Sequence, residues 1–196
     1  MPLSTARTRI PELQIEMLDS NSETEDLEEL AAQLLRISPS VKALPPDALI
    51  AEISRVRLPK ESTNDANGRE RALLERTRIR LEQLGHQVSL AIADDPETAC
   101  IVARWSTQNH IITPGNNRSA LRDLPIASLS LPETQARFLN SMGIRTVGEF
   151  AELPSSAVAS RMGSSGITAH AMAQGRSSRP PISIESNPQT WTLSRD

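Results

Sequence analysis

The chain of 196 residues is poor in the side chains that build many common sites. It has one cysteine, three histidines, two tryptophans, two phenylalanines and no tyrosine. A single cysteine excludes a disulfide framework, a cysteine-rich zinc site and an iron–sulfur cluster. Three widely separated histidines argue against a histidine-built metal centre. Aromatic residues make up 2 % of the chain, which is too few for a sheet that stacks nucleic-acid bases.

Long apolar runs are missing as well. No segment approaches the length of a membrane span, and the first residues lack the pattern of a signal peptide. We therefore expect a cytoplasmic protein without a membrane partner. The length suits one ordinary domain or two small ones.

Charge is distributed unevenly along the chain. Residues 1–100 contain 12 Lys+Arg and 18 Asp+Glu, whereas residues 101–196 contain 9 Arg, no Lys and 6 acidic residues. Such a chain could bind an anion with its second half alone, although the charges alone favour ordinary variation in composition. The arginines that could line a groove for a phosphate backbone are Arg118, Arg122, Arg137, Arg145, Arg161, Arg176 and Arg179.

The first half alternates short apolar runs with helical periodicities. The patterns predict strands at 13–18, 40–44, 48–54 and 88–93, and helices at 23–36, 69–84 and 96–105. This alternation predicts an α+β domain over residues 1–113, in which one sheet is covered by helices. Over residues 114–178 we expect only short helices, broken by proline and glycine, and residues 179–196 are predicted to be an extended or disordered tail.

A helix–hairpin–helix pattern occupies residues 138–150. One predicted helix ends at Gly143, and Thr146 with Glu149 forms a capping box that begins the next. We expect the glycine to allow a close approach, the free N–H groups of the second helix to attract phosphate, and Arg145 to add a full charge. Such a site binds the nucleic-acid backbone and reads no bases. A plain pair of helices with a glycine cap fits the same residues.

Asp47 is a candidate for a catalytic metal ligand. Phosphoryl transfer uses several carboxylates that converge on two cations. The neighbours of Asp47 are Pro45, Pro46 and Ala48, so the spacing favours an aspartate in a turn, with no metal and no cofactor.

The order of these segments resembles that of a Y-family (UmuC/DinB-type) translesion DNA polymerase, and most of all the ImuB-type members that have lost catalysis. The resembling segments are 1–7 and 10–13 for the fingers, 38–42 with Asp47 and 90–96 for the palm, and 139–154, 162–163 and 174–176 for the thumb. The resemblance implies an incomplete palm-like sheet followed by a small all-α helix–hairpin–helix thumb. The DNA-binding residues that it implies are Gly143, Ile144, Arg145, Thr146, Gly163 and Gly166.

The chain departs from the family at the catalytic positions. Asp47 stands where the family's acidic pair would begin, but Ala48 follows it, so Asp47 is a lone remnant. The two lysines that face the triphosphate in the family align with Pro96 and Cys100. The family's first catalytic aspartate would lie before residue 1. The resemblance therefore implies a protein without polymerase activity, because one aspartate cannot build a two-metal site.

The function implied is that of a non-catalytic, DNA-binding accessory protein in translesion synthesis, DNA repair and the SOS response. Its partners would be the backbone of damaged or primer–template DNA, together with a catalytic translesion polymerase, a recombinase or a sliding clamp. Two alternatives stay open: a protein-interaction module that binds no DNA, and a non-functional fragment of such a gene.

Overall fold

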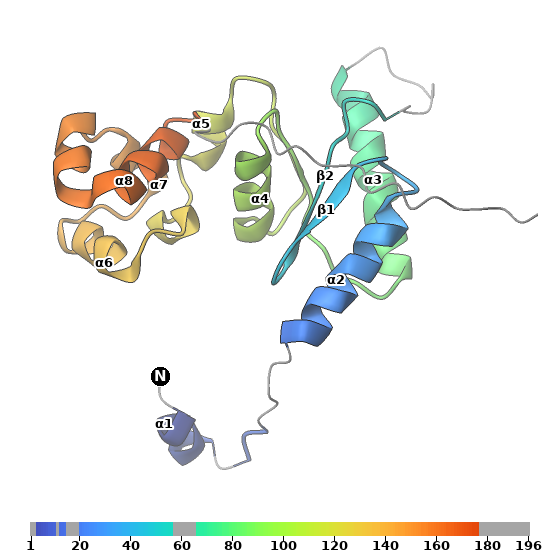
Figure 1. Cartoon of the computed structure of the whole chain (residues 1–196), viewed down its shortest axis with the longest axis horizontal. Coiled ribbons are helices and arrows are strands. Elements are labelled where there is room, and N and C mark those ends of the chain that lie inside the picture. Colours follow the sequence, from blue (N-terminus) through green and yellow to red (C-terminus); the bar gives the residue numbers. More distant parts are fainter. Residues whose placement is uncertain (1–2, 11, 15–19, 57–65, 177–196) are drawn as a thin grey trace, which may run out of the picture.

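The structure, a computed structural model, describes residues 3–10, 12–14, 20–56 and 66–176. Its elements are α1 (Leu3–Arg9), α2 (Ser20–Leu34), β1 (Val41–Leu44), β2 (Ala48–Ala51), α3 (Ala66–Gln83), β3 (Ala91–Ile92), α4 (Pro96–Trp105), β4 (His110–Ile111), α5 (Asn117–Leu121), the 3-10 helix η1 (Ile126–Leu129), α6 (Glu133–Ser141), α7 (Val147–Ala151) and α8 (Ser155–Ala173). Helix α4 stands between two regions (Figure 1). We call α2, α3 and the four strands the N-terminal region, and α5 to α8 with η1 the C-terminal region.

Strands β1 and β2 form an antiparallel hairpin in the N-terminal region. Their register places Val41 opposite Ala51 and Leu44 opposite Ala48. The buried Ser38 hydroxyl donates to the carbonyl oxygen of Glu52 at 2.6 Å, which ties the start of the hairpin to its end. Helix α2 packs against β1 and β2, and α4 also contacts β2. The hairpin is therefore held between an N-terminal helix and the central one.

Strands β3 and β4 form a second pair, which is parallel. His110 N donates to Leu90 O at 3.0 Å, and Ile112 N donates to Ile92 O at 2.8 Å. Parallel neighbours need a crossover connection, and α4 provides it. The two strands and α4 are thus one β–α–β unit.

Helix α4 begins where the sequence predicts. Asp95 is its N-cap, and the Asp95 carboxylate accepts from Thr98 N at 2.8 Å and from the Thr98 hydroxyl at 2.7 Å. Pro96 occupies the first turn, where its missing N–H costs nothing. The predicted bounds of 96–105 are confirmed.

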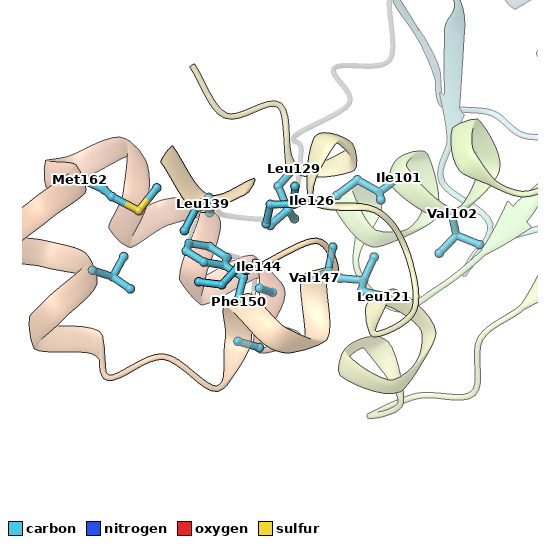
Figure 2. Close-up of a cluster of buried hydrophobic side chains, with 14 of the residues drawn as sticks. Ile101, Val102, Leu121, Ile126, Leu129, Leu139, Ile144, Val147, Phe150 and Met162 are labelled. Carbon is cyan, nitrogen blue, oxygen red and sulfur yellow. The ribbon is translucent and has the colours of Figure 1, made fainter. Parts of the chain in front are cut away.

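One hydrophobic cluster runs from α4 through the C-terminal region (Figure 2). Its members are Ile101, Val102, Ile112, Leu121, Ile126, Leu129, Leu139, Ile144, Val147, Phe150, Ala151, Val158, Met162, Ala169 and Ala173. Leu121, Leu139, Val147 and Phe150 are fully buried within it. The boundary predicted between residues 113 and 114 falls inside the stretch of chain that builds this cluster.

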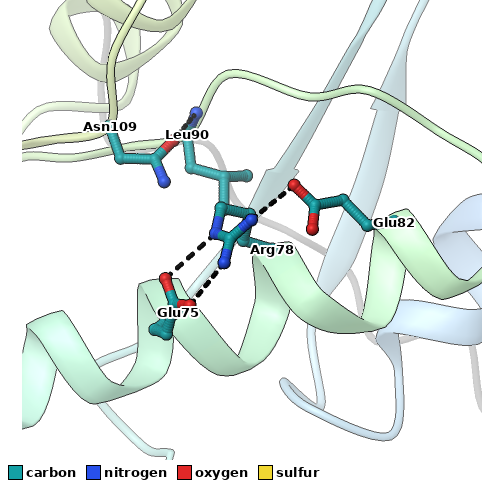
Figure 3. Close-up of polar contacts among 5 residues, drawn as sticks. All are labelled: Glu75, Arg78, Glu82, Leu90 and Asn109. Atoms are coloured by element: carbon teal, nitrogen blue, oxygen red, sulfur yellow. Dashed lines mark hydrogen bonds and ion pairs between the residues drawn. The ribbon is translucent and has the colours of Figure 1, made fainter.

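On the surface of α3, Arg78 is paired with two glutamates of the same helix. Figure 3 shows Arg78 between two carboxylates of the same helix: its guanidinium donates to Glu75 at 2.5 and 3.0 Å and to Glu82 at 2.5 Å. These bonds raise the pKa of Arg78 and lower that of Glu75. In the same view Asn109 Oδ1 accepts from Leu90 N at 3.1 Å. Arg78 is therefore already paired within its own helix.

The α+β fold is confirmed, but the expectation of one sheet is wrong for the described residues. Their strands form two separate pairs, because β1 and β2 bond to each other while β3 bonds to β4. The predicted strand at 88–93 is shortened to β3, and the prediction missed β4. Residues 15–18 of the strand predicted at 13–18, and the whole predicted tail, lie outside the described residues.

Candidate functional site

Asp47 lies in the turn between β1 and β2, as the sequence predicts, and its side chain is 57 % exposed. Arg104, near the end of α4, contacts this carboxylate although the two residues are 57 positions apart in the sequence. Its Nη2 and Nε atoms donate to Asp47 Oδ1 at 2.6 and 3.1 Å. Ala48, the next residue, is the first of β2. The lone aspartate is thus engaged by a cationic side chain of the same protein.

The face of α4 beside this ion pair carries three residues spaced by four positions. Pro96, Cys100 and Arg104 lie on one side of the helix because of that spacing. Cys100 is partly buried, and desolvation raises the pKa of its thiol, while Arg104 lowers that pKa and Asp47 raises it through their charges. Arg104 was not a candidate from the sequence. Its regular spacing from Pro96 and Cys100 is the signal that points to it.

Among the described residues, no three histidine, cysteine, aspartate or glutamate side chains gather as a set that could hold a metal ion. Every helix in that part of the chain falls short of a bilayer span in length or in apolar content.

Residues 142–146 form the turn between α6 and α7. Gly143 is exposed, with φ +83°, and a Cβ added there would meet nothing within 4 Å. Ile144 is 8 % exposed and belongs to the hydrophobic cluster, whereas Arg145 is exposed. The turn is therefore anchored by Ile144 and presents Gly143 and Arg145 to solvent.

The N–H groups of this turn are not free, so the expectation that they await an anion is wrong. Their acceptors are Asn140 O for Gly143, Leu139 O for Ile144, the Glu149 carboxylate for Arg145 and Thr146, Leu124 O for Val147, Arg122 O for Gly148, and the Thr146 hydroxyl for Glu149. The capping box predicted from Thr146 and Glu149 is present. Its glutamate accepts hydrogen bonds from two of the N–H groups that the sequence pattern assigns to phosphate.

Hydrogen bonds from this turn lower the pKa of Glu149. Its carboxylate accepts from Arg145 N at 2.7 Å and from Thr146 N at 3.0 Å. Both bonds favour the ionised form, and they lower the pKa of Glu149 from its usual 4.5. The turn thus contains a built-in anion.

A second glycine turn lies inside α8. In place of the short helices expected in this part of the chain, the structure has one element, Ser155–Ala173, interrupted at Gly163 with φ +62°. Gln135 Nε2 on α6 donates to Met162 O at 3.0 Å and to the Ser165 hydroxyl at 2.9 Å, so this turn packs beside α6. Gly163 is exposed with open space around it.

Gly166 has a packing role. It is buried, and a Cβ added there would lie 2.2 Å from Met162 Cβ and 3.3 Å from Val158 Cγ1. The close approach of the helix to these two side chains explains the glycine. Its contact with DNA stays a prediction.

Ion pairs divide the candidate arginines into two groups. Arg118 pairs with Glu152 at 2.6 Å and Arg137 with Glu133 at 3.2 Å, and Arg176 donates to Gln174. Three arginines have exposed side chains that make no hydrogen bond or ion pair with the described residues: Arg122, Arg145 and Arg161. Arg179 lies outside those residues. The arginines still available to an external anion are thus fewer than the sequence suggests.

No family model matches the chain. Among curated proteins, Protein ImuB of Caulobacter vibrioides is 30 % identical over 154 residues, which are 79 % of this chain and 32 % of ImuB. The chain therefore spans about a third of the length of the curated relatives that it matches.

Solved structures show the fold. DinB from Sulfolobus solfataricus matches with a TM-score of 0.68 at 16 % identity, over 92 % of this chain and 53 % of DinB. A Y-family DNA polymerase chimera matches with a TM-score of 0.66 at 17 % identity, over 92 % of this chain and 52 % of the chimera. The resemblance drawn from the sequence is confirmed. The chain is a Y-family-like protein related to ImuB.

Proposed function

We propose that the chain is a non-catalytic accessory protein of translesion synthesis and DNA repair that acts in the cytoplasm and binds the backbone of duplex DNA through its C-terminal region. The relation to ImuB and the polymerase fold support a role in translesion synthesis. The observation that carries the DNA-binding role is the solvent-facing turn of α6 and α7, where Arg145 is exposed and its guanidinium makes no ion pair with the described residues. Gly143 beside it leaves room for a strand to approach.

Asp47 supports the absence of catalysis. A catalytic carboxylate of a polymerase presents its oxygens to divalent cations, but Asp47 Oδ1 accepts two hydrogen bonds from Arg104. Ala48 offers no second carboxylate beside it. The chain would then hold DNA without extending it.

Charge also favours a backbone contact over base recognition. Between residues 114 and 178 the chain has six arginines, no lysine and four acidic residues. Guanidinium groups bind phosphate oxygens, and such contacts carry no sequence information. We therefore expect affinity for duplex DNA that depends on salt and is indifferent to sequence.

The test is fluorescence anisotropy of a labelled primer–template duplex titrated with the full chain over a series of salt concentrations. Binding should weaken linearly on a log–log plot, and Arg145→Gln should reduce the slope by about 0.9, the loss expected for one phosphate contact. Arg137→Gln is the matched control, because Arg137 is exposed on α6 but paired with Glu133. The same duplex should stay unextended with Mg²⁺ and nucleoside triphosphates.

Absence of salt-dependent binding by the unaltered chain would reject the DNA-binding role, and one added nucleotide would reject the non-catalytic one. A second candidate is a module that binds a polymerase, a recombinase or a sliding clamp. It is favoured by Leu35, directly after α2, and Ile79 on α3, which are 49 % and 43 % exposed. Recovery of such a partner from a nuclease-treated extract, without any DNA binding, would favour this candidate.

A further inference from the structure

The segment before η1 runs alongside the turn that precedes α7. Ile126 N donates to Arg145 O at 2.8 Å, and Val147 N donates to Leu124 O at 2.9 Å. Further along, Gly148 N donates to Arg122 O at 2.8 Å. Two segments that are distant in sequence thus meet at the start of α7, and each brings an exposed arginine, Arg122 or Arg145.

The side chain of Arg122 fills the space beside Gly148. A Cβ added at Gly148 would lie 2.6 Å from Arg122 Cγ and 3.0 Å from Arg122 O. Both distances are far shorter than ordinary van der Waals contact. The methylene stem of Arg122 therefore lies directly against the second residue of α7, and a larger residue at position 148 would displace it.

The charges around this contact leave the Arg122 guanidinium available. The nearby Glu149 carboxylate is occupied by the N–H groups of Arg145 and Thr146. Asp123, the chain neighbour of Arg122, is exposed. Within the described part of the chain, no ion pair or hydrogen bond involves the guanidinium of Arg122.

We propose that Arg122 is a second phosphate-binding side chain, which the stem contact with Gly148 positions beside the α6–α7 turn. The ligand class is the phosphodiester backbone of nucleic acid. This inference rests on the proposed function and deepens it. It assigns the bonds to phosphate to two guanidinium groups, those of Arg122 and Arg145, which come from different segments. The N–H groups of the turn, which are already paired, take no part.

The experiment uses the full chain and the same labelled duplex over the salt series. Arg122→Gln should weaken binding several-fold at moderate salt and lower the log–log slope by about 0.9. Arg122→Lys keeps the charge and should retain most of the slope. Arg118→Gln is the control on the same segment, since Arg118 is paired with Glu152.

Gly148→Ala tests the positioning without removing any charge. The added methyl group should move Arg122 and weaken binding, and combining it with Arg122→Gln should add little. If Gly148→Ala lowers the melting temperature, its binding result is set aside. The salt slopes of Arg122→Gln and Arg122→Lys, which change only an exposed side chain, then decide the proposal. A wild-type slope in Arg122→Gln, with a reduced slope in Arg145→Gln, would overturn this inference and leave DNA binding intact. No binding by the unaltered chain would overturn both.

Discussion

The two regions on either side of α4 are built differently. The C-terminal region shares one continuous cluster of buried side chains with α4. The buried apolar side chains of the N-terminal region lie outside that cluster: Leu34, Ile50, Leu73, Leu74 and Leu81. Burial of apolar surface is the main favourable term in folding. The C-terminal region, with the larger set of buried apolar side chains, therefore gains more folding free energy from burial. The N-terminal region depends more on the β1–β2 hairpin and on helix packing around it.

Phe150→Ala should have the largest effect and should reveal which elements share the cluster. Phe150 is fully buried and packs edge-on against His170, with ring centroids 5.3 Å apart. Truncation of a buried phenylalanine costs about 3–5 kcal/mol of unfolding free energy. Hydrogen exchange should show α5 to α8 losing protection. Helix α4 should lose it with them, because Ile101 and Val102 belong to the same cluster.

Leu81→Ala is the matched substitution in the N-terminal region. Leu81 on α3 is 2 % exposed and lies outside the cluster. We expect a loss of about 2–5 kcal/mol, the range for truncation of a buried leucine. Its effect should be confined to the N-terminal region, including β4, which α3 contacts. Equal loss of protection in α5 to α8 would mean that the two regions unfold as one unit, and the contrast drawn between them would be wrong.

The parts of this architecture that depend on neighbouring residues can be predicted from the sequence. Asp95-Pro96 predicts the start of α4, and Thr146 with Glu149 predicts the start of α7, because each signal acts within one helical turn. The pairing of β3 with β4 was missed, because each strand has only two residues. The ion pair of Asp47 with Arg104 joins residues 57 positions apart. Such distant contacts leave no local pattern in a single sequence.

The same limit applies to the candidate site. The exposure of Gly143 and Arg145 agrees with a binding turn, but the expectation of free N–H groups does not hold. Glu149, which signals the helix start in the sequence, is the group that occupies two of those donors. The contact between Arg122 and Gly148 depends on how two segments pack. A pattern shows which donors exist, whereas packing decides which stay available.

Glu149→Gln should have a smaller, pH-dependent effect, confined to the C-terminal region. Because the pKa of Glu149 is lowered in the folded protein, its contribution is fully present above the unfolded value of about 4.5 and is lost as the pH falls through the folded value. At pH 7 the variant should melt a few degrees lower, as for other lost caps. The difference in melting temperature should shrink between pH 5 and pH 3. A difference that stays constant over this range would mean that the carboxylate charge adds nothing to the turn.

Arg104→Ala should have the smallest effect, and it tests the link between the hairpin and α4. The Asp47 and Arg104 side chains are 57 % and 36 % exposed, and exposed pairs contribute about 0–1 kcal/mol. A double-mutant cycle with Asp47→Asn should therefore give a coupling energy below about 1 kcal/mol that decreases with salt. Hydrogen exchange of β1 and β2 should change only slightly, because α2 and the Ser38 bond to Glu52 still hold the hairpin. A coupling above about 3 kcal/mol, the range of buried pairs, would instead make this ion pair a principal connection between the N-terminal region and α4, and through the cluster to the α6–α7 turn.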